Sequence, residues 1–272
     1  MKRLMFTALA AALALPLFAQ KPVTIRGSDT MVIMNARLAE AYMRNNPAQI
    51  QVTGGGSGVG LAALINGTTD IAASSRPMRT SEKDKLKQRF NALPAEIAIA
   101  RDGLAVYLHE RNPLKELTLA QIRDIYTGRV TNWKQVGGND ATIVIYSREN
   151  SSGTYVYFKE NVLLNKDFSP RAQTLQGTAA VVNAVSKDPN GIGYGGAAYA
   201  KGIRFAAVKK DEKSAGYTPT QEAVRAGQYP ITRFLYLYLR TAPKGDMKKF
   251  VDFALSPAGQ QIVSQVGYFP VK

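Results

Sequence analysis

Residues 49–74 read QIQVTGGGSGVGLAALINGTTDIAAS, and this stretch decides the fold. Residues 49–54 have the composition of a β-strand. Residues 59–67 carry apolar side chains at helical spacing and end at Gly67, a residue type that commonly follows a helix. A second strand pattern follows in residues 69–74. Strands that alternate with amphipathic helices are typical of α/β proteins, so the stretch predicts an α/β fold.

The same alternation extends along the rest of the chain, with no internal repeat and no long linker. The predicted strands are residues 23–27, 49–54, 69–74, 102–110, 141–148, 192–196 and 229–240. The predicted helices are residues 31–46, 59–67, 119–128, 155–164, 178–191 and 247–270, the last with a break at Pro257. Two domains would therefore have to be joined by short crossings rather than by a flexible tether.

The first twenty residues, MKRLMFTALAAALALPLFAQ, have the pattern of a secretory signal peptide. Lys2 and Arg3 give a positive start, an apolar run follows from Leu4 to Phe18, and Ala19 is small enough to precede a cleavage site. The run is shorter than the roughly 20 residues that a membrane-spanning helix needs. We therefore expect cleavage near residues 19–20 and a soluble periplasmic protein that begins at about Lys21.

Charge and cysteine content limit the function classes. The chain has 272 residues and a formal charge of +15, to which the signal peptide contributes Lys2 and Arg3. A basic balance favours anionic partners, although the scattered lysines and arginines also fit a plain solvated surface. An exported protein meets little nucleic acid, so we expect no nucleic-acid partner. The absence of cysteine excludes thiolate metal sites and disulfides.

The glycine loop in residues 54–58 has two interpretations. A strand, a glycine run and a helix start can hold backbone N–H groups around an anion at the positive end of the helix dipole. The same glycines also suit a tight turn that only permits close packing. The loop lacks the Gly-Lys-Ser/Thr ending of a nucleotide phosphate loop, and Val59 breaks the GxGxxG dinucleotide pattern.

Three more polar clusters follow predicted strands: residues 27–30 (GSDT), 74–76 (SSR) and 148–154 (RENSSGT). Each supplies hydroxyl groups, and two of them bring an arginine, whose planar fork matches oxyanions. Ligands of open α/β sheets collect at the carboxyl ends of strands. The four clusters therefore predict one convergent oxyanion site, with four unrelated helix caps as the alternative.

The sequence offers groups to hold an anion but no evident group to cleave one. His109 is the only histidine, and no cluster of acidic residues and histidine has the spacing of metal ligands. Ser57 has neighbouring N–H groups but no base near it in sequence. We expect a binding protein with no metal and no cofactor.

Several motifs together resemble the periplasmic phosphate-binding proteins of ABC importers, the PstS family. They are GSDT, VTGGGSGVGLAALINGTTDIAASSRPM, LAQIRDIYTGRVTNW, SRENSSGTYVYF, GIGYGG and GQQIVSQVGYFPV. The resemblance spans essentially the whole mature chain. It implies a two-lobed type II periplasmic-binding-protein fold, in which each lobe is a mixed sheet flanked by helices and the ligand lies between the lobes. The implied boundaries are 21–104 with 230–272 for the first lobe and 105–229 for the second.

The resemblance also implies which residues bind phosphate. They are Ser28, Asp29, Thr30, the Met31 backbone, Ser57, Ser75, Arg76, Arg148, Ser152, Gly153 and Thr154. Some family members carry a carboxylate in the loop that reads Ser-Ser-Arg here, where it accepts the proton of phosphate. This sequence has none there, so we hypothesise that Asp29 takes that role, with Glu149 as a weaker candidate. The alternative is that Asp29 caps the following helix.

The resemblance predicts a monomer that delivers inorganic phosphate to an ABC transporter permease. Sulfate, molybdate or a phosphonate would suit the same fold, so the identity of the oxyanion stays open from sequence. An exported phosphatase is a further alternative, against which the missing base and metal ligands argue. A sensor or adhesin built on the same fold is another.

Overall fold

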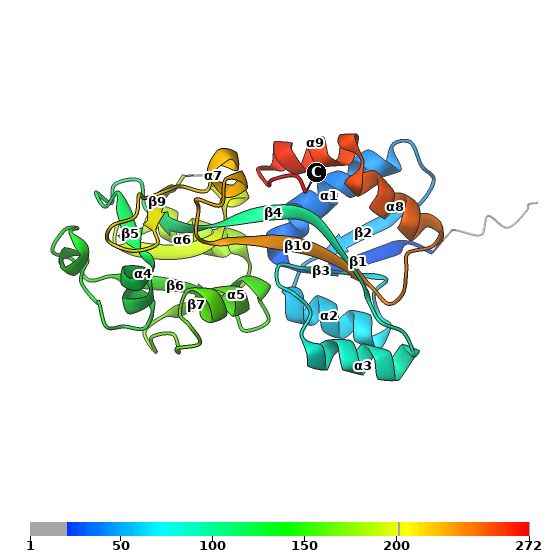
Figure 1. The fold of residues 1–272 in the computed structure, drawn as a ribbon, viewed down its shortest axis with the longest axis horizontal. Helices are drawn as coiled ribbons and strands as arrows, with labels where there is room; N and C mark the ends of the chain where they lie inside the picture. The colour runs from blue at the N-terminus through cyan, green and yellow to red at the C-terminus, as the bar shows by residue number, and fades with distance from the viewer. Residues whose placement is uncertain (1–20, 201, 272) are drawn as a thin grey trace, which may run out of the picture.

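The computed structural model describes residues 21–200 and 202–271, so the predicted signal peptide lies outside the described residues. The predicted alternation of strands and helices is confirmed. Ten strands form one sheet with the main order β2-β1-β3-β10-β4-β8-β6-β7, and β9 pairs with β4 and β5. Figure 1 shows two groups of elements joined by two long strands, and we refer to the groups as the first and second lobes.

The first lobe is built on three parallel strands and an antiparallel neighbour. The strands are β1 (Val23–Gly27), β2 (Ile50–Thr53), β3 (Ile71–Ser74) and β10 (Thr232–Leu239). The helices are α1 (Val32–Met43), α2 (Ser57–Asn66), α3 (Thr80–Phe90), α8 (Gly245–Leu255) and α9 (Pro257–Val266). Helices α1, α8 and α9 pack together on one side of the sheet, and α2 packs with α3 on the other (Figure 1).

The second lobe has shorter elements. Its strands are β5 (Glu116–Thr118), β6 (Val144–Arg148), β7 (Gln173–Leu175), β8 (Gly191–Gly196) and β9 (Arg204–Lys209). Its helices are α4 (Leu119–Tyr126), α5 (Gly153–Asn161), α6 (Thr178–Lys187) and α7 (Gln221–Arg225). The Thr118 hydroxyl accepts the Gln121 N–H at 3.1 Å, which confirms the predicted start of α4. Strand β6 is parallel to both β7 and β8.

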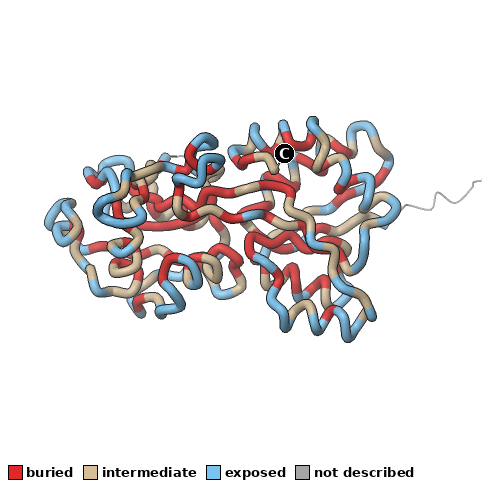
Figure 2. The backbone as a smooth tube through the Cα atoms, in the orientation of Figure 1, coloured by how far each residue is buried: buried red, intermediate tan, exposed pale blue. Residues whose placement is uncertain are grey.

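Two strands cross between the lobes. Strand β4 (Ala95–Leu108) pairs with β10 as far as Gly103, and from Leu104 onward it pairs with β8 instead. Each lobe has its own large core, around Leu235 and Phe250 in the first and around Tyr126 and Phe158 in the second. Figure 2 shows the crossing strands as a mostly buried band. The lobes are thus joined by a narrow pair of strands between two independent cores.

The structure departs from the sequence prediction at several elements. Strand β4 begins at Ala95, seven residues before the predicted start, because residues 95–101 mix alanines with charged side chains and lack a clear strand pattern. Strands β5 and β7 have three residues each, too few to show a period. Strand β9 and helix α7 were also not predicted. No helix among the described residues is long and apolar enough to cross a membrane.

Candidate functional site

Parallel pairing brings the polar clusters of the first lobe to one edge of its sheet. Strands β2 and β3 both pair with β1, so the segments that follow the three strands lie close together. The Ser28 N–H donates to the Ala73 carbonyl at 2.9 Å, and the Gly56 N–H donates to the Gly27 carbonyl at 2.9 Å. The three predicted clusters of this lobe therefore meet.

The glycines of this loop allow close packing of α2 and set the backbone conformation that leads into Ser57. A Cβ at Gly60 would lie 2.3 Å from the Arg26 carbonyl oxygen, so this glycine lets α2 press against β1. Gly55 and Gly56 have φ values of 110° and 94°, which L side chains rarely adopt. That backbone turns Ser57 into the first residue of α2. The packing interpretation therefore holds for Gly60, and the anion cradle stays a prediction.

The loop also touches the second lobe directly. The Gly58 N–H donates to the Ser151 carbonyl at 2.9 Å, and the Ser151 hydroxyl donates to the Gly55 carbonyl at 3.2 Å. A Cβ at Gly56 would lie 2.6 Å from the Ser151 carbonyl oxygen. The two lobes are therefore in backbone contact at this loop.

Hydroxyl groups from both lobes converge beside the glycine loop. Ser57 Oγ accepts the Ser75 N–H at 3.0 Å and lies 3.3 Å from Ser75 Oγ. A Cβ at Gly153 would lie 2.3 Å from Ser57 Oγ and 2.7 Å from Ser75 Oγ. Thr30 Oγ1 lies 2.8 Å from Thr154 Oγ1 across the lobes. The start of α5 thus sits directly against the hydroxyls of the first lobe.

The Ser152 side chain has a local task at the same place. Its Oγ accepts the N–H groups of Thr154 and Tyr155 at 3.2 and 3.3 Å, which is an N-cap of α5. The cap holds Gly153 and Thr154 at the positive end of that helix. Ser152 therefore orients the segment that faces the first lobe.

Arg148 is the most heavily bonded side chain of the site, and its side chain is only 1% exposed. Its Nε and Nη2 donate to the two carboxylate oxygens of Glu149 at 3.0 and 2.9 Å. Its Nη1 donates to Thr178 Oγ1 at 2.8 Å, and its Nη2 donates to Asp29 Oδ2 at 3.0 Å. The bond to Asp29 is a charge pair between the lobes.

Asp29 faces across the site rather than along its own helix. Its Oδ1 accepts the Gly55 N–H at 2.9 Å, and its Oδ2 accepts from Arg148. Neither the 3-10 turn Asp29–Met31 nor α1 has a side-chain cap. The alternative interpretation of Asp29 as a cap of the following helix is therefore wrong, because the glycine loop and Arg148 occupy its carboxylate. Tyr199 OH donates to the Asp29 carbonyl at 2.6 Å, and burial, with the charge of Asp29, raises the pKa of Tyr199 to about 12.

Two predicted ligands are directed elsewhere. The Arg76 guanidinium donates to both carboxylate oxygens of Glu82 on α3, at 2.8 and 2.7 Å, and to the Pro77 carbonyl at 2.9 Å. Both of its terminal nitrogens are thus bonded within the first lobe, whereas its buried Nε has no hydrogen-bond partner among the described residues. The Met31 N–H donates to the Ser28 carbonyl at 2.9 Å inside a 3-10 turn, and the Met31 side chain lies in the core. These bonds argue against Arg76 and Met31 as ligands.

The structure adds residues that the sequence motifs did not single out. Thr154 Oγ1 accepts from Arg233 Nη2 at 3.0 Å, and Arg233 Nε and Nη2 donate to Asp102 Oδ2 at 3.0 and 2.8 Å. This pair is a direct cross-strand neighbour in β4 and β10. The available signal was one charge of each sign beside the apolar runs of the two strands, Asp102 before residues 104–108 and Arg233 before residues 234–239. Thr178 follows β7 at the start of α6, the same strand-to-helix position as the other clusters.

The site is deeply covered. Ser28, Thr30, Ser57, Ser75, Arg148 and Thr154 are all buried, and a pocket of about 340 Å³ at the surface is lined by Asp29, Gly55, Glu149, Ser151, Gln176 and Gly177. His109 does not belong to this group, since its Nδ1 accepts the Arg111 N–H in the turn after β4. Within residues 21–200 and 202–271, no group of three acidic or histidine residues has a geometry that would hold a metal ion.

Comparison with known proteins places this geometry in a family. A model described as the PBP superfamily domain matches residues 17–258. The phosphate-binding protein PstS of Pseudomonas aeruginosa is 34% identical over 263 residues, which cover 90% of this chain and 81% of the relative.

Two solved structures agree with that match. One, described as a phosphate ABC transporter substrate-binding protein of Clostridium perfringens with bound phosphate, is 32% identical with a TM-score of 0.84. The alignment covers 93% of this chain and 100% of that one. An ABC-type phosphate transport receptor of Vibrio cholerae is 29% identical with a TM-score of 0.73 and coverages of 91% and 99%. The expected two-lobed type II periplasmic-binding-protein fold is confirmed, and these relatives are named as binding proteins rather than enzymes.

Proposed function

The chain belongs to the PstS family of phosphate-binding proteins within the PBP superfamily, and we propose that it binds inorganic phosphate between its lobes and delivers it to an ABC transporter permease. It does so as a periplasmic, monomeric receptor. One observation carries the proposal: the buried Arg148 reaches Asp29 across the lobes at 3.0 Å, beside the hydroxyls of Thr30 and Thr154. A guanidinium among hydroxyls, with a carboxylate opposite, is a donor set suited to a protonated oxyanion.

The proposed ligand set excludes the two predicted residues whose bonds lie within the first lobe. We retain Ser28, Asp29, Thr30, Ser57, Ser75, Arg148, Ser152, Gly153 and Thr154, and we omit Met31 and Arg76. Four of the five N–H donors of Arg148 have partners in Glu149, Thr178 and Asp29. A bound anion would accept hydrogen bonds from Arg148 and from the hydroxyl groups. It would thereby replace some of the bonds that Arg148 makes to its present partners and that the hydroxyls make to each other.

The charges around the proposed site make the proton of monohydrogen phosphate important for selectivity. Arg148 carries one positive charge against the two carboxylates of Asp29 and Glu149. A fully ionised oxyanion without a proton would meet the Asp29 carboxylate as a repulsive neighbour. Monohydrogen phosphate instead donates a hydrogen bond through its P–O–H group to that carboxylate, whereas sulfate has no proton to donate. Asp29 is therefore our candidate for the residue that selects phosphate over sulfate.

Access to the site requires the lobes to separate. The proposed ligands are buried, and direct bonds such as Gly58 to Ser151 cross between the lobes. Among the strands of the described residues, β4 and β10 are the two that run between the lobes, and β4 changes its pairing partner between Gly103 and Leu104. This change supports the predicted lobe boundary at 104/105, with the return to the first lobe at 229/230. Bending of these two strands opens and closes the site.

The chemistry proposed is binding without turnover. His109 serves its own turn, and the hydroxyl of Ser57 is bonded to Ser75 rather than to a histidine or carboxylate base. A phosphatase would need a base or a metal ion to activate its nucleophile. The groups that the described residues bring together can hold an anion, and this set of groups supports a receptor.

Calorimetry of the purified protein with phosphate, sulfate and molybdate tests the proposal. We expect phosphate to bind most tightly, and a preference for sulfate or molybdate contradicts the phosphate assignment. In Asp29→Asn, phosphate affinity should fall by about 10- to 100-fold while sulfate affinity holds or rises, because the repulsion and the proton acceptor are both removed. Asp252→Asn, on the exposed face of α8, is the matched control. Unchanged discrimination in Asp29→Asn excludes Asp29 as the acceptor.

A further inference from the structure

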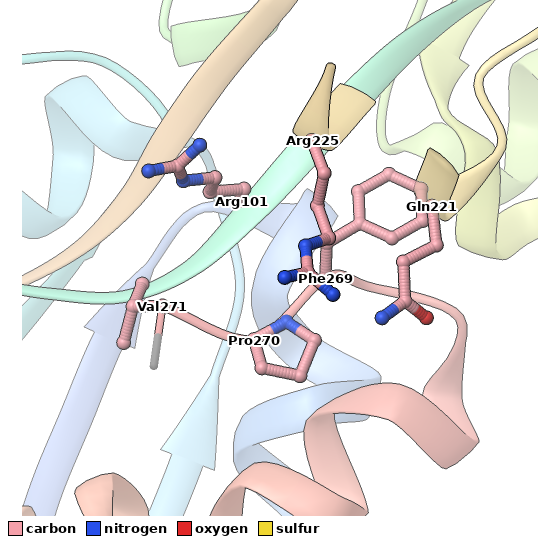
Figure 3. A pocket seen from close by; sticks show the side chains of 6 residues that line it. All are labelled: Arg101, Gln221, Arg225, Phe269, Pro270 and Val271. Atoms are coloured by element: carbon pink, nitrogen blue, oxygen red, sulfur yellow. The ribbon is translucent and has the colours of Figure 1, made fainter. Parts of the chain in front are cut away.

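A second polar pocket lies on the opposite side of the crossing strands from the phosphate site. Arg101 and Asp102 are neighbours on β4, and successive side chains of a strand point to opposite faces. Asp102 pairs with Arg233, which bonds Thr154 of the site. Arg101 therefore points away from the site, where it lines a pocket of about 370 Å³ (Figure 3).

Both lobes and the crossing strand contribute to this pocket. The second lobe supplies Gln221 and Arg225, which are four residues apart and so share one face of α7. The first lobe supplies residues 269–271, the segment that follows α9. Figure 3 shows the Arg225 side chain extending from α7 toward Phe269 and Pro270. The pocket is thus a junction between the lobes at the crossing strands.

The segment 269–271 is held on both sides. The Val271 N–H donates to Gln260 Oε1 on α9 at 2.9 Å, which ties it to the first lobe. Phe269 exchanges backbone hydrogen bonds of 2.7 and 2.9 Å with Arg101, and its ring belongs to the core cluster of the second lobe. A change in the angle between the lobes must therefore alter the shape of this pocket.

The charges that face the pocket are not neutralised by nearby carboxylates. Among the described residues, no carboxylate oxygen lies within 4.0 Å of the guanidinium of Arg101 or of Arg225. The Nε of Arg101 is buried and has no hydrogen-bond partner there. Its guanidinium lies over the Phe234 ring, 5.0 Å from the centroid. A buried donor without a partner is costly unless a ligand or water satisfies it.

We propose that this pocket binds a small organic or inorganic anion with two separated oxyanionic groups, which acts as an effector of phosphate binding. Arg101 and Arg225 each hold one anionic group, the Gln221 amide adds a donor, and Phe269, Pro270 and Val271 provide an apolar floor. A volume of about 370 Å³ suits a molecule of the size of citrate or pyrophosphate. Because the pocket spans the lobes, its occupant favours one lobe arrangement and thereby changes phosphate affinity.

Titration of the intact protein with citrate and with pyrophosphate, at saturating phosphate, tests the site. We expect binding with millimolar or tighter affinity, weakened at least tenfold in Arg225→Gln, which should fold like wild type because the Arg225 side chain is exposed. Arg101→Gln should weaken binding similarly. Arg171→Gln, another exposed arginine of the second lobe, should not. The proposal is overturned if neither probe binds below about 10 mM, or if Arg171→Gln weakens binding as much as Arg225→Gln.

A second measurement distinguishes this site from the phosphate site. In Arg148→Ala the probes should still bind. If Arg148→Ala abolishes probe binding while Arg225→Gln binds the probes as wild type does, the probes occupy the phosphate site. Phosphate affinity should be the same in Arg225→Gln and wild type without a probe. With a probe present, wild-type phosphate affinity should shift by a factor equal to the shift that phosphate causes in probe affinity. No shift in either direction overturns the effector role.

Discussion

Arg148 and Arg76 lie at similar places in the two lobes, but their side chains have different partners. Arg148 is the last residue of β6 and Arg76 lies two residues after β3, each is preceded by serine, and we expected both to bind phosphate. Arg148 pairs with Glu149 of its own lobe and with Asp29 of the other. Arg76 pairs only with Glu82, within the first lobe. We therefore infer that the position of the carboxylate partner, rather than the local motif, distinguishes the proposed ligand Arg148 from Arg76, which stabilises its own lobe.

The comparison predicts two separable kinds of defect. Arg148 links the lobes where the ligand is proposed to bind, so its loss should act on ligand affinity. Arg76 ties the segment after β3 to the start of α3, where Glu82 also accepts the Arg79 N–H at 2.8 Å. Its loss should act on the stability of the first lobe and leave ligand affinity nearly intact.

The largest expected effect belongs to Arg148→Ala. This change removes the buried guanidinium and leaves the partly buried Asp29 and Glu149 without their partner, and breaking a buried pair costs up to about 3–5 kcal/mol. Phosphate affinity should fall by about 100- to 1000-fold in isothermal calorimetry. Arg123→Ala, a second-lobe arginine that donates to the Val162 carbonyl, is the control. Near wild-type affinity in Arg148→Ala would show that the second lobe does not hold the anion.

Gly153→Ala should give the next largest loss, without any change of charge. The added Cβ would lie 2.3 Å from Ser57 Oγ, so the start of α5 could no longer approach the first lobe. Phosphate affinity should fall by about 10- to 100-fold, with the melting temperature of the ligand-free protein little changed. The control is Ser151→Ala, which removes only the exposed bond of 3.2 Å to the Gly55 carbonyl. Equal affinities of Gly153→Ala and wild type would show that the lobes need not meet at Gly153 for binding.

Much of the framework was predictable from local sequence. Residues 49–74 predicted the strand, loop, helix and strand that became β2, α2 and β3, and Gly67 ends α2 with a φ of 73°. The polar clusters were also predicted to meet, since parallel strands place their carboxyl ends at one edge. These features depend on short-range periodicity and on turn chemistry, which a single sequence displays directly.

The partners of individual charges were not predictable in the same way. Asp102 and Arg233 are 131 residues apart, and only the register of β4 against β10 brings them together. The guanidinium of Arg76 bonds Glu82 because Glu82, six residues later in the first turn of α3, turns its carboxylate back toward the end of β3. Such pairings depend on the three-dimensional course of the chain. This explains why the meeting of the clusters could be predicted from the sequence, whereas the pairing of Arg76 with Glu82 could not.

A smaller effect, on stability, is expected for Arg76→Met. The substitution keeps most of the buried aliphatic volume but leaves Glu82, whose side chain is 20% exposed, without its two-point partner. The free energy of unfolding should fall by about 2–3 kcal/mol, or roughly 5–10 °C in melting temperature. Phosphate affinity should change by less than threefold. A large loss of phosphate affinity in a folded Arg76→Met protein would show that Arg76 contributes to phosphate binding, as Arg148 is proposed to do.

The smallest expected effect concerns the pH dependence of the same pair. Burial alone raises the pKa of Glu82, but hydrogen bonds from Arg76 and from the Arg79 backbone, with the charges of both arginines, leave the pKa below its ordinary value of 4.5. A lowered pKa in the folded state stabilises the protein above pH 4.5 and ceases to do so as the pH falls through the folded-state value. Glu82→Gln should therefore melt below wild type at pH 7, and the difference should shrink as the pH falls below 4.5. Glu110→Gln, exposed after β4, should track wild type throughout. A difference between Glu82→Gln and wild type that stays constant from pH 7 to pH 3 would mean that Glu82 acts through packing rather than through its charge.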